Sequence, residues 1–516
     1  MASVISAGTT SGTSLNLTGD TSGQLQLQTN GTTVAVTIGT DQKATFVADA
    51  TISGLTVGKG GGAVAQNTAL GAYAVLNNTS GAFNTGVGYS ALNANTTASA
   101  NTAVGYVAMN ATTTGSSNTG LGFASLYTNT TGTANTAIGQ DALRLNTTAS
   151  NNTAVGYQSM YSNTTGQFNV AVGISALYSN TTSDANTAVG RNALRLNTAA
   201  NNSAFGFNSM DANTTGNSNA AFAYGSLQSN TTGSSNTAIG LQALASNTTA
   251  SENTAVGYQA LYSNTTGTVN TAIGTYALNK TTTGGSNSAL GYAALYLNTT
   301  GQYNIAFGES ALRNNTTASN NTAVGYQAGY TNSTGTSNTY IGKGSGYLST
   351  GNSNTFIGVN SGYTVTGDYN VAIGGFASGA TATGSYNTML GYNAGVNMTS
   401  GSKNTIVGGY NGNQDGLDIR TSSNYVVLSD GDGNRAAYWQ SGGGWVQKNN
   451  STSWSTYSDQ RIKENIVDVE NGLAIITALR PVEFDYKIGE KNHDIGFIAQ
   501  EYQQVLPSQV VGTTSG

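Results

Sequence analysis

From residue 67 to about residue 412, apolar and polar residues follow one pattern that repeats every 17 residues, N-T-A-V-G-Y-x-A-L-x-x-N-T-T-G-x-x. Positions within each copy are counted from its leading Asn, which is position 0. The leading Asn occurs 21 times, and the step shortens to 16 residues after Asn186, Asn338 and Asn354. Position 4 is Gly in every copy except one, where Ala223 stands, and position 3 is always Val, Ile, Leu or Phe. A fixed period of this length predicts a repeat architecture.

Seventeen residues are too few for a helical hairpin, and Gly, Asn and Thr are poor helix formers. We therefore predict an all-β fold, a repetitive parallel β-solenoid or β-roll shaft in which each copy forms one coil. A coil would contain a short strand through N-T-A-V-G-Y, a second short strand around A-L, and a return through N-T-T-G, where Gly and Asn tolerate positive φ. A stack of this many coils at roughly 4.8 Å each would give a rod on the order of 100 Å long.

Two columns of apolar residues are expected to fill the interior of the stack. The first is position 3, for example Val104, and the second is position 8, from Leu92 to Leu312. The small residues beside position 3, such as Ala103 and Gly105, would leave room for another chain to approach closely. The pattern therefore predicts an aliphatic core and contacts between chains through the small residues.

The leading Asn and the Gly at position 4 predict a structural ladder. Asn side chains in successive coils would hydrogen-bond to their copies above and below, as stacked amides do in cross-β arrays, and would fix the register. A single stack of thin coils buries little core, so we expect three chains to associate, either as solenoids side by side or intertwined in one β-helix. The ladder residues that we single out are Asn101, Asn152, Asn253, Gly105, Gly156 and Gly257.

Both ends of the repeat differ from it. Before residue 63, Leu25, Leu27 and Val34 alternate with polar residues, which predicts strands of a small β cap or of a segment that attaches to a particle. After residue 412, a cluster of tryptophans is expected to close the shaft as an aromatic plug, with a platform for stacking carbohydrate as the alternative. From Asn321 onward position 8 changes to Gly, at Gly329, Gly346, Gly362, Gly395 and Gly412, so the shaft should narrow or its chains should repack. The predicted segments are 1–62, 63–328, 329–412, 413–457 and 458–516.

Composition argues against several classes of function. Charged residues make up 8% of the chain, the net charge is −5 and the pI is near 4.9, which disfavours a nucleic-acid groove of clustered Lys and Arg. The chain has no Cys, and its one His and scattered carboxylates suggest no ligand cluster, so we expect no metal and no cofactor. We recognise no run of 18 apolar residues and no secretory signal, so we expect no membrane insertion.

The composition changes again from Ser458, because 14 of the chain's charged residues and both prolines lie beyond it. Residues 471–479 predict a helix and residues 482–488 a strand. Three motifs occur in this part: S-D-Q-R-I-K-E-N-I from Ser458, L-R-P-V from Leu479 and I-G-F-I-A-Q-E from Ile495. Together they resemble the intramolecular chaperone of endosialidase family.

The resemblance implies a domain that lies at the C-terminus of phage tail fibres and spikes, promotes trimer folding, and then releases itself by cutting the chain. Carried over, it makes Ser458 the nucleophile and Lys463 the base, with the cleavage site at Tyr457, Ser458 and Asp459. The protein would then be at most a single-turnover autoproteolytic serine peptidase without an external substrate. A neutral, desolvated Lys can accept the hydroxyl proton without a His. Without the resemblance, Ser458 or Asp459 would be interpreted as a helix N-cap.

The two residues of the dyad implied by the resemblance are five positions apart. This spacing corresponds to about 140° on a helix and to opposite faces of a strand, so a turn or another subunit must join Ser458 and Lys463. We therefore expect the dyad to be completed only in the assembled trimer. Family members usually continue for many residues after the last motif, whereas this sequence stops at Gly516. We expect a shortened domain, or a sequence that is incomplete at this end.

These features predict a structural virion protein, the homotrimeric tail fibre of a bacteriophage, which recognises the host cell. The expected partners are further copies of the chain, phage tail or baseplate proteins, and a host-surface receptor such as a carbohydrate. One alternative is a trimeric bacterial surface adhesin, which would need an export signal and a membrane anchor. Another is a polysaccharide-degrading tailspike, which would need two acids roughly 5 to 10 Å apart. The acids of the repeat lie in different coils: Asp141, Asp184, Asp211, Glu252, Glu309 and Asp368.

Overall fold

The computed structural model describes residues 55–379 and 382–441 continuously. Elsewhere it describes residues 18–19, 25–29, 33–38, 44–46, 50–52, 446–447, 472–484, 494–498, 501 and 504–505. The chain divides into two compact units, Met1–Asn370 and Val371–Gly516. Strands are the main regular secondary structure of the described residues, and the helix α1 (Gly472–Ala478) has only seven residues, so the predicted all-β class is confirmed. None of the described helices has the length and apolar character that crossing a bilayer requires.

Six short strands precede the repeat. The first four form an antiparallel sheet in the order β1-β2-β3-β4, which confirms the strands predicted from Leu25 and Val34. β5 and β6 form a separate antiparallel pair, and β6 also pairs with the first strand of the repeat, so this edge of the ladder is covered. The strands are β1 (Thr18–Gly19), β2 (Leu25–Thr29), β3 (Thr33–Ile38), β4 (Ala44–Phe46), β5 (Ala50–Ile52) and β6 (Leu55–Gly58).

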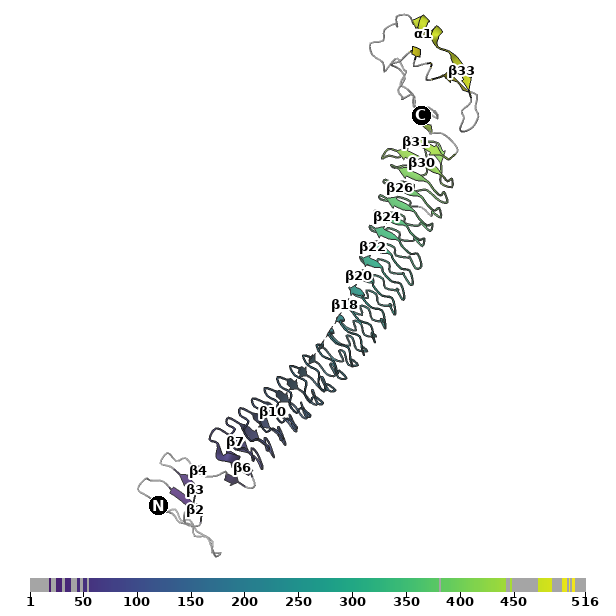
Figure 1. The fold of residues 1–516 in the computed structure, drawn as a ribbon. Coiled ribbons are helices and arrows are strands. Elements are labelled where there is room, and N and C mark those ends of the chain that lie inside the picture. The colour runs from purple at the N-terminus through teal and green to yellow at the C-terminus, as the bar shows by residue number, and fades with distance from the viewer. Residues whose placement is uncertain are drawn as a thin grey trace, which may run out of the picture. The chain divides into compact units, whose positions relative to one another are not determined.

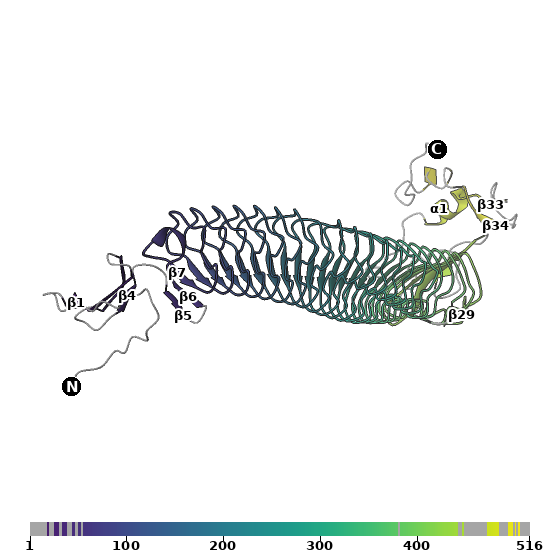
Figure 2. The same cartoon turned by 90° about the horizontal axis from the view of Figure 1, so that it is seen from below.

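Each copy of the repeat forms one coil with a single three-residue strand at positions 1 to 3. Within the first unit the strands stack in parallel, and identical positions pair, for example Ala137 with Ala154 (Figures 1 and 2). The predicted solenoid and its repeat are therefore confirmed. The strands of this unit are β7 (Thr68–Leu70), β8 (Thr85–Val87), β9 (Thr102–Val104), β10 (Thr119–Leu121), β11 (Thr136–Ile138), β12 (Thr153–Val155), β13 (Val170–Val172), β14 (Thr187–Val189), β15 (Ser203–Phe205), β16 (Ala220–Phe222), β17 (Thr237–Ile239), β18 (Thr254–Val256), β19 (Thr271–Ile273), β20 (Ser288–Leu290), β21 (Ile305–Phe307), β22 (Thr322–Val324), β23 (Thr339–Ile341) and β24 (Thr355–Ile357).

The second strand predicted around positions 7 and 8 is wrong. In the described coils of the first unit, these positions lie in a turn whose amides bond to the neighbouring coils. Leu92 N donates to Ala108 O at 3.0 Å, and Ser90 N donates to Ala72 O at 2.9 Å. The φ angles of Ser90 and Leu92 are 54° and 52°. A strand cannot contain left-handed residues, so this arc bends and closes the coil.

Position 2 faces the interior, and position 3 faces outward. Ala103 at position 2 has 0% exposure, whereas Leu121 and Ile239 at position 3 have 44% and 42%. The prediction of an interior aliphatic column at position 3 is therefore wrong, and so is the prediction that Ala103 is turned to another chain; Gly105 is half-buried. Alternate residues of a strand face opposite sides, so an inward position 2 turns positions 1 and 3 outward.

The interior of residues 67–320, the Leu coils, combines a small residue at position 2 with a large apolar residue at position 8. Every position-8 side chain from Val75 to Leu312 is fully buried, which confirms this column as interior. It packs on position 2 of the following coil: a Cβ placed on Gly120 would lie 2.7 Å from Met109 Cγ. The coil is so thin that one large side chain fills it.

Residues 321–369, the Gly coils, exchange these two roles. Position 8 is Gly, and large side chains enter from position 2, where Tyr340 and Phe356 both have 0% exposure. A Cβ on Gly329 would lie 2.6 Å from the Tyr340 ring, and a Cβ on Gly362 would overlap the Phe356 ring. The side chains therefore repack within the chain, and the interior stays filled.

The second unit begins with three more coils and then leaves the repeat. β25, β26 and β27 are its coil strands; β30 continues the parallel ladder beyond β27, and β31 and β32 add to it in antiparallel register. α1 and β33 confirm the predicted helix and the first part of the predicted strand near the C-terminus. The elements are β25 (Val371–Ile373), β26 (Thr388–Leu390), β27 (Thr405–Val407), β28 (Asn413–Gln414), β29 (Leu417–Asp418), β30 (Tyr425–Ser429), β31 (Arg435–Gln440), β32 (Val446–Gln447), α1 (Gly472–Ala478), β33 (Pro481–Phe484) and β34 (Asp494–Phe497).

Candidate functional site

The leading Asn residues form a buried column that links successive coils. The side-chain nitrogen of Asn152 donates to Gly166 O at 2.9 Å, and its side-chain oxygen accepts the backbone N–H of Asn169 at 2.9 Å. Asn101 and Asn253 make the same two kinds of bond at 2.9 to 3.0 Å. Each Asn thus closes the return of its own coil and satisfies a buried N–H of the next coil, which fixes the step between coils.

Position 11 carries a second buried Asn column, which the sequence reasoning placed only in a turn. Here the side chains bond directly to one another: Asn146 donates to the side-chain oxygen of Asn129 at 2.8 Å, and Asn163 donates to that of Asn146 at 3.0 Å. All three side chains have 0% exposure. The signal was present, because position 11 is Asn in most copies, and a turn alone does not need the same residue in so many coils.

The Gly at position 4 lies where successive backbones come closest. Gly105, Gly156 and Gly257 have φ angles of 140°, 129° and 131°. A Cβ on Gly156 would lie 2.7 Å from Gly173 O of the next coil. Ala223, the one exception among the copies, keeps a φ of 127°. The position therefore favours Gly because of both its backbone conformation and its lack of space.

Position 9 carries rows of aromatic rings and arginines on the surface of the Leu coils. Arg144 lies 5.8 Å from the ring centroids of both Tyr127 and Tyr161, which is within the range of a cation–π contact. Two of the acidic residues that a tailspike active site would draw on form ion pairs with arginines. Arg144 contacts Asp141 at 3.1 Å, and Arg195 contacts Asp211 at 2.7 Å. The hydrogen bond from Arg195 to Asp211 raises the pKa of this arginine. These acids therefore serve as partners of basic side chains.

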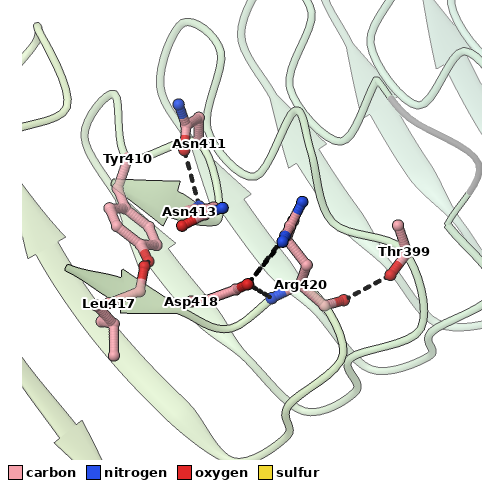
Figure 3. A network of polar contacts seen from close by, with 7 residues as sticks. All are labelled: Thr399, Tyr410, Asn411, Asn413, Leu417, Asp418 and Arg420. Carbon is pink, nitrogen blue, oxygen red and sulfur yellow. Dashed lines mark hydrogen bonds and ion pairs between the residues drawn. The ribbon is translucent and has the colours of Figure 1, made fainter. Parts of the chain in front are cut away.

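The repeat ends in a polar network within the second unit (Figure 3). Tyr410 is fully buried there, and its hydroxyl donates to Leu417 O at 2.6 Å; burial raises the pKa of Tyr410 to about 12. Arg420 holds Asp418 through two bonds of 2.7 and 3.0 Å. Thr399 Oγ1 donates to Arg420 O at 3.0 Å, which ties the segment after the hairpin of β28 and β29 to the preceding coil. The network closes the end of the repeat.

Two of the three C-terminal motifs meet in the structure. β33 and β34 pair in antiparallel register, with Val482 opposite Gly496. Arg480 reaches Glu501 through bonds of 2.5 and 3.0 Å, and these hydrogen bonds raise the pKa of Arg480 and lower that of Glu501. Since both side chains are exposed, we expect the ion pair to orient the two motifs more than to stabilise them.

The predicted catalytic residues Ser458 and Lys463, and the cleavage-site residues Tyr457 and Asp459, lie outside the described residues. Their roles therefore stay predictions. In the aromatic region ahead of them, Trp439 on β31 is half-buried.

A family model described as chaperone of endosialidase matches residues 458–511. The matched range includes all three motifs, and it supports a C-terminal chaperone domain of a family associated with trimer assembly. The searches of curated proteins and of solved structures found no match to the chain. The molecule thus combines a solenoid shaft with a following segment that matches a chaperone family.

Proposed function

We propose that the protein is the homotrimeric tail fibre of a bacteriophage, a structural virion protein that attaches to the host cell. The observation that carries the proposal is the order of its parts: a stack of near-identical coils is followed by a match to the chaperone of endosialidase family at residues 458–511. A chaperone domain that assists trimer assembly has a purpose when the chain ahead of it must associate with its own copies. The expected partners are phage tail or baseplate proteins at one end and a host receptor, such as a carbohydrate, at the other.

The geometry of the first unit suits a spacer. Its ladder from β7 to β24 spans roughly 80 Å at a strand spacing of about 4.8 Å. Strand amides and the column of leading Asn residues join each coil to the next, and the second Asn column adds side-chain bonds between many of the coils. The shaft should therefore resist bending and shear. Such a part would hold a receptor-binding region away from the particle.

The C-terminal domain is proposed to promote trimer formation and then to leave by one self-cleavage. Neutral Lys463 would take the proton of the Ser458 hydroxyl, and the Ser458 oxygen would attack a peptide carbonyl at the cleavage site, Tyr457 to Asp459. The bond from that carbonyl carbon to the amide nitrogen would break, and the nitrogen would receive the proton. The acyl group would then remain as an ester on the Ser458 oxygen, and a water molecule would hydrolyse this ester to a free carboxylate and restore the Ser458 hydroxyl. Completion of the dyad by a second subunit would make cleavage follow assembly.

Intact mass, measured under denaturing and native conditions, tests this proposal on the full chain. We expect the wild type to be a trimer of chains that end near residue 457, and Ser458→Ala to be a trimer of full-length chains. Ser455→Ala is the matched control and should be cleaved like the wild type. Full-length chains in all three proteins would contradict the self-cleavage, and a monomeric wild type would contradict the fibre.

A further inference from the structure

We propose that the outward side of β7 to β24, here called the strand face and formed by positions 1 and 3 of the first unit's coils, is the surface along which copies of this chain pack in register. The inference rests on the proposed homotrimer and locates its contact on the shaft. It replaces the expectation that the small residues at position 2 make this contact, because those residues are buried inside their own coil.

Position 3 forms an apolar row along the length of the strand face. Position 3 is an aliphatic residue or Phe in every coil, and many of these side chains are well exposed, among them Leu121, Ile239, Leu290 and Phe307 with 38% exposure or more. Exposed apolar residues that occur singly need no partner, but a contiguous row of them marks an interaction surface. A row that runs the length of the shaft therefore needs a partner of similar length.

The positions that form the strand face carry no charged residue. The coils from residue 67 to residue 370 contain twelve charged residues, and none of them is at position 1, 2 or 3. Position 1 is Thr in most coils, and its other residues are Ser, Ala, Val and Ile. Arginines and acids occur instead at other positions, such as position 9 with Arg144 and Asp211. Loss of charge is typical of the buried centre of an interface, whereas charges gather at its rim.

The spacing of the face identifies a second copy as its partner. The apolar side chains recur at each strand, every 4.8 Å or so, and a partner stays in phase over the whole ladder only if it has the same spacing. Another copy of the shaft has this spacing by construction, whereas a globular protein would cover only a few coils. A family whose domain assists trimer assembly then favours three copies.

Differences in size along position 3 would set the axial register of the copies. Phe205 and Phe222 occupy neighbouring coils and stack with ring centroids 4.8 Å apart, whereas Val189 and Ile239 flank them. A slip of one coil would place a Phe of one chain against the level where its partners present Val or Ile. Overpacked and underpacked contacts both destabilise an interface core, so the bulky level disfavours the slip.

Cysteine labelling tests the location of the interface, because the chain contains no native Cys. Leu121→Cys lies on the strand face, and Leu145→Cys lies in the turn of the next coil; the two leucines have similar exposures of 44% and 37%. In the native protein we expect maleimide to label Leu145→Cys at least tenfold faster than Leu121→Cys. In denaturant the two rates should become equal.

Native mass of the same samples separates the two proposals. If both cysteine variants are trimers and are labelled at equal rates, the proposed interface is overturned and the proposed fibre is not. A monomer would overturn the homotrimer and the interface with it. Leu121→Asp and Leu145→Asp provide a second readout: the Leu121 variant should weaken the trimer on dilution, whereas the Leu145 variant should not. Equal trimer dissociation of the two variants would also count against the strand face.

Discussion

The Leu coils and the Gly coils solve one packing problem in opposite ways. In a Leu coil the large side chain comes from the turn, as with Leu312, and the strand supplies Ala323 of the next coil. In a Gly coil the large side chain comes from the strand, as with Tyr340, and the turn supplies Gly329. The comparison shows that one large side chain is enough to fill the contact between two successive coils, and that either the turn of one coil or the strand of the next can supply it.

The two solutions differ in backbone strain. Position 8 is left-handed in both, with φ of 48° at Leu312 and 61° at Gly329. A non-glycine residue in this region is strained by about 1 to 3 kcal/mol, whereas Gly adopts it freely. The Leu coils therefore carry a strain that burial of the leucine must offset, and the Gly coils avoid it by moving the bulk to the strand.

The largest expected effect on stability comes from the large side chain of a Gly coil, Tyr340, and its small neighbour Gly329. Tyr340→Ala would leave a cavity beside Gly329 and should lower the free energy of unfolding by about 3 to 5 kcal/mol. Gly329→Leu alone would overlap the Tyr340 ring and should lower it by about 1 to 3 kcal/mol. The double variant recreates the Leu-coil arrangement and should recover most of both losses. Urea unfolding of the four proteins measures this coupling, and simple addition of the two losses would contradict it.

The Asn ladder should be equally important in both kinds of coil. Asn152→Ala and Asn338→Ala each remove the acceptor of a buried N–H, so each should lower the free energy of unfolding by about 1 to 3 kcal/mol. Exposed Asn217→Ala is the control and should change it little. Hydrogen exchange at Asn169 and Asn354, which lose their acceptors, gives the local readout. Protection that falls in only one kind of coil would show that the ladder depends on the core.

A smaller, pH-dependent effect is expected where a tyrosine fills the last copy of the repeat. Burial raises the pKa of Tyr410 from 10 to about 12, so the neutral hydroxyl is favoured in the folded state. Its contribution to stability is therefore fully present below pH 10 and is lost as the pH rises through about 12. Tyr410→Phe lacks this titration, so the stability difference between wild type and variant should shrink over that range. Urea unfolding of both proteins at several pH values measures this stability difference. A difference that stays constant over the range would contradict the expected titration of Tyr410.

The smallest expected effect on stability is that of a cation–π contact on the surface. The change from Leu coils to Gly coils alters the interior and should leave this surface contact unchanged. Arg313 of the last Leu coil lies 5.3 Å from the Tyr296 ring centroid and 5.9 Å from that of Tyr330, which belongs to the first Gly coil. Arg313→Gln should cost about 0.5 to 1 kcal/mol. Arg191→Gln, at a single ring contact with Phe207, is the matched control and should cost less. A loss as large as that of Tyr340→Ala would mean that the surface row supports the core.

The period of the sequence was sufficient to predict the solenoid, its strand at positions 1 to 3 and the buried residue at position 8. The orientation of position 3 was predicted wrongly, because Val is more apolar than Ala and was therefore expected inside. The structure shows why the reverse holds: side chains such as Leu143 already fill the thin coil, so only a small residue, Ala or Gly, fits opposite them. The partner that we propose for the exposed aliphatic residues lies outside the chain, and a pattern within one chain does not reveal it.

The left-handed arc was also beyond sequence reasoning. Positive φ is normally a sign of Gly or Asn, yet Leu177 and Met210 adopt it with φ of 50° and 49°. Bonds to the coils on both sides enforce this conformation, so it follows from stacking and not from local preference. At the C-terminus, the motifs predicted the domain that the family match supports, and the roles of Ser458 and Lys463 stay predictions.

Because identical positions pair in successive coils, the length of the shaft can change only in steps of one whole coil. Removal of residues 236–252 would bring Asn253 onto Asn219 and leave every kind of contact between coils in place, while the shaft shortens by roughly 4.8 Å. The 16-residue copy after Asn186 shows that one residue fewer is accommodated at the return corner, since Thr187 N still donates to Asn202 O at 2.9 Å. The length of such a shaft is therefore free to change by duplication or loss of repeats, without redesign of its interior.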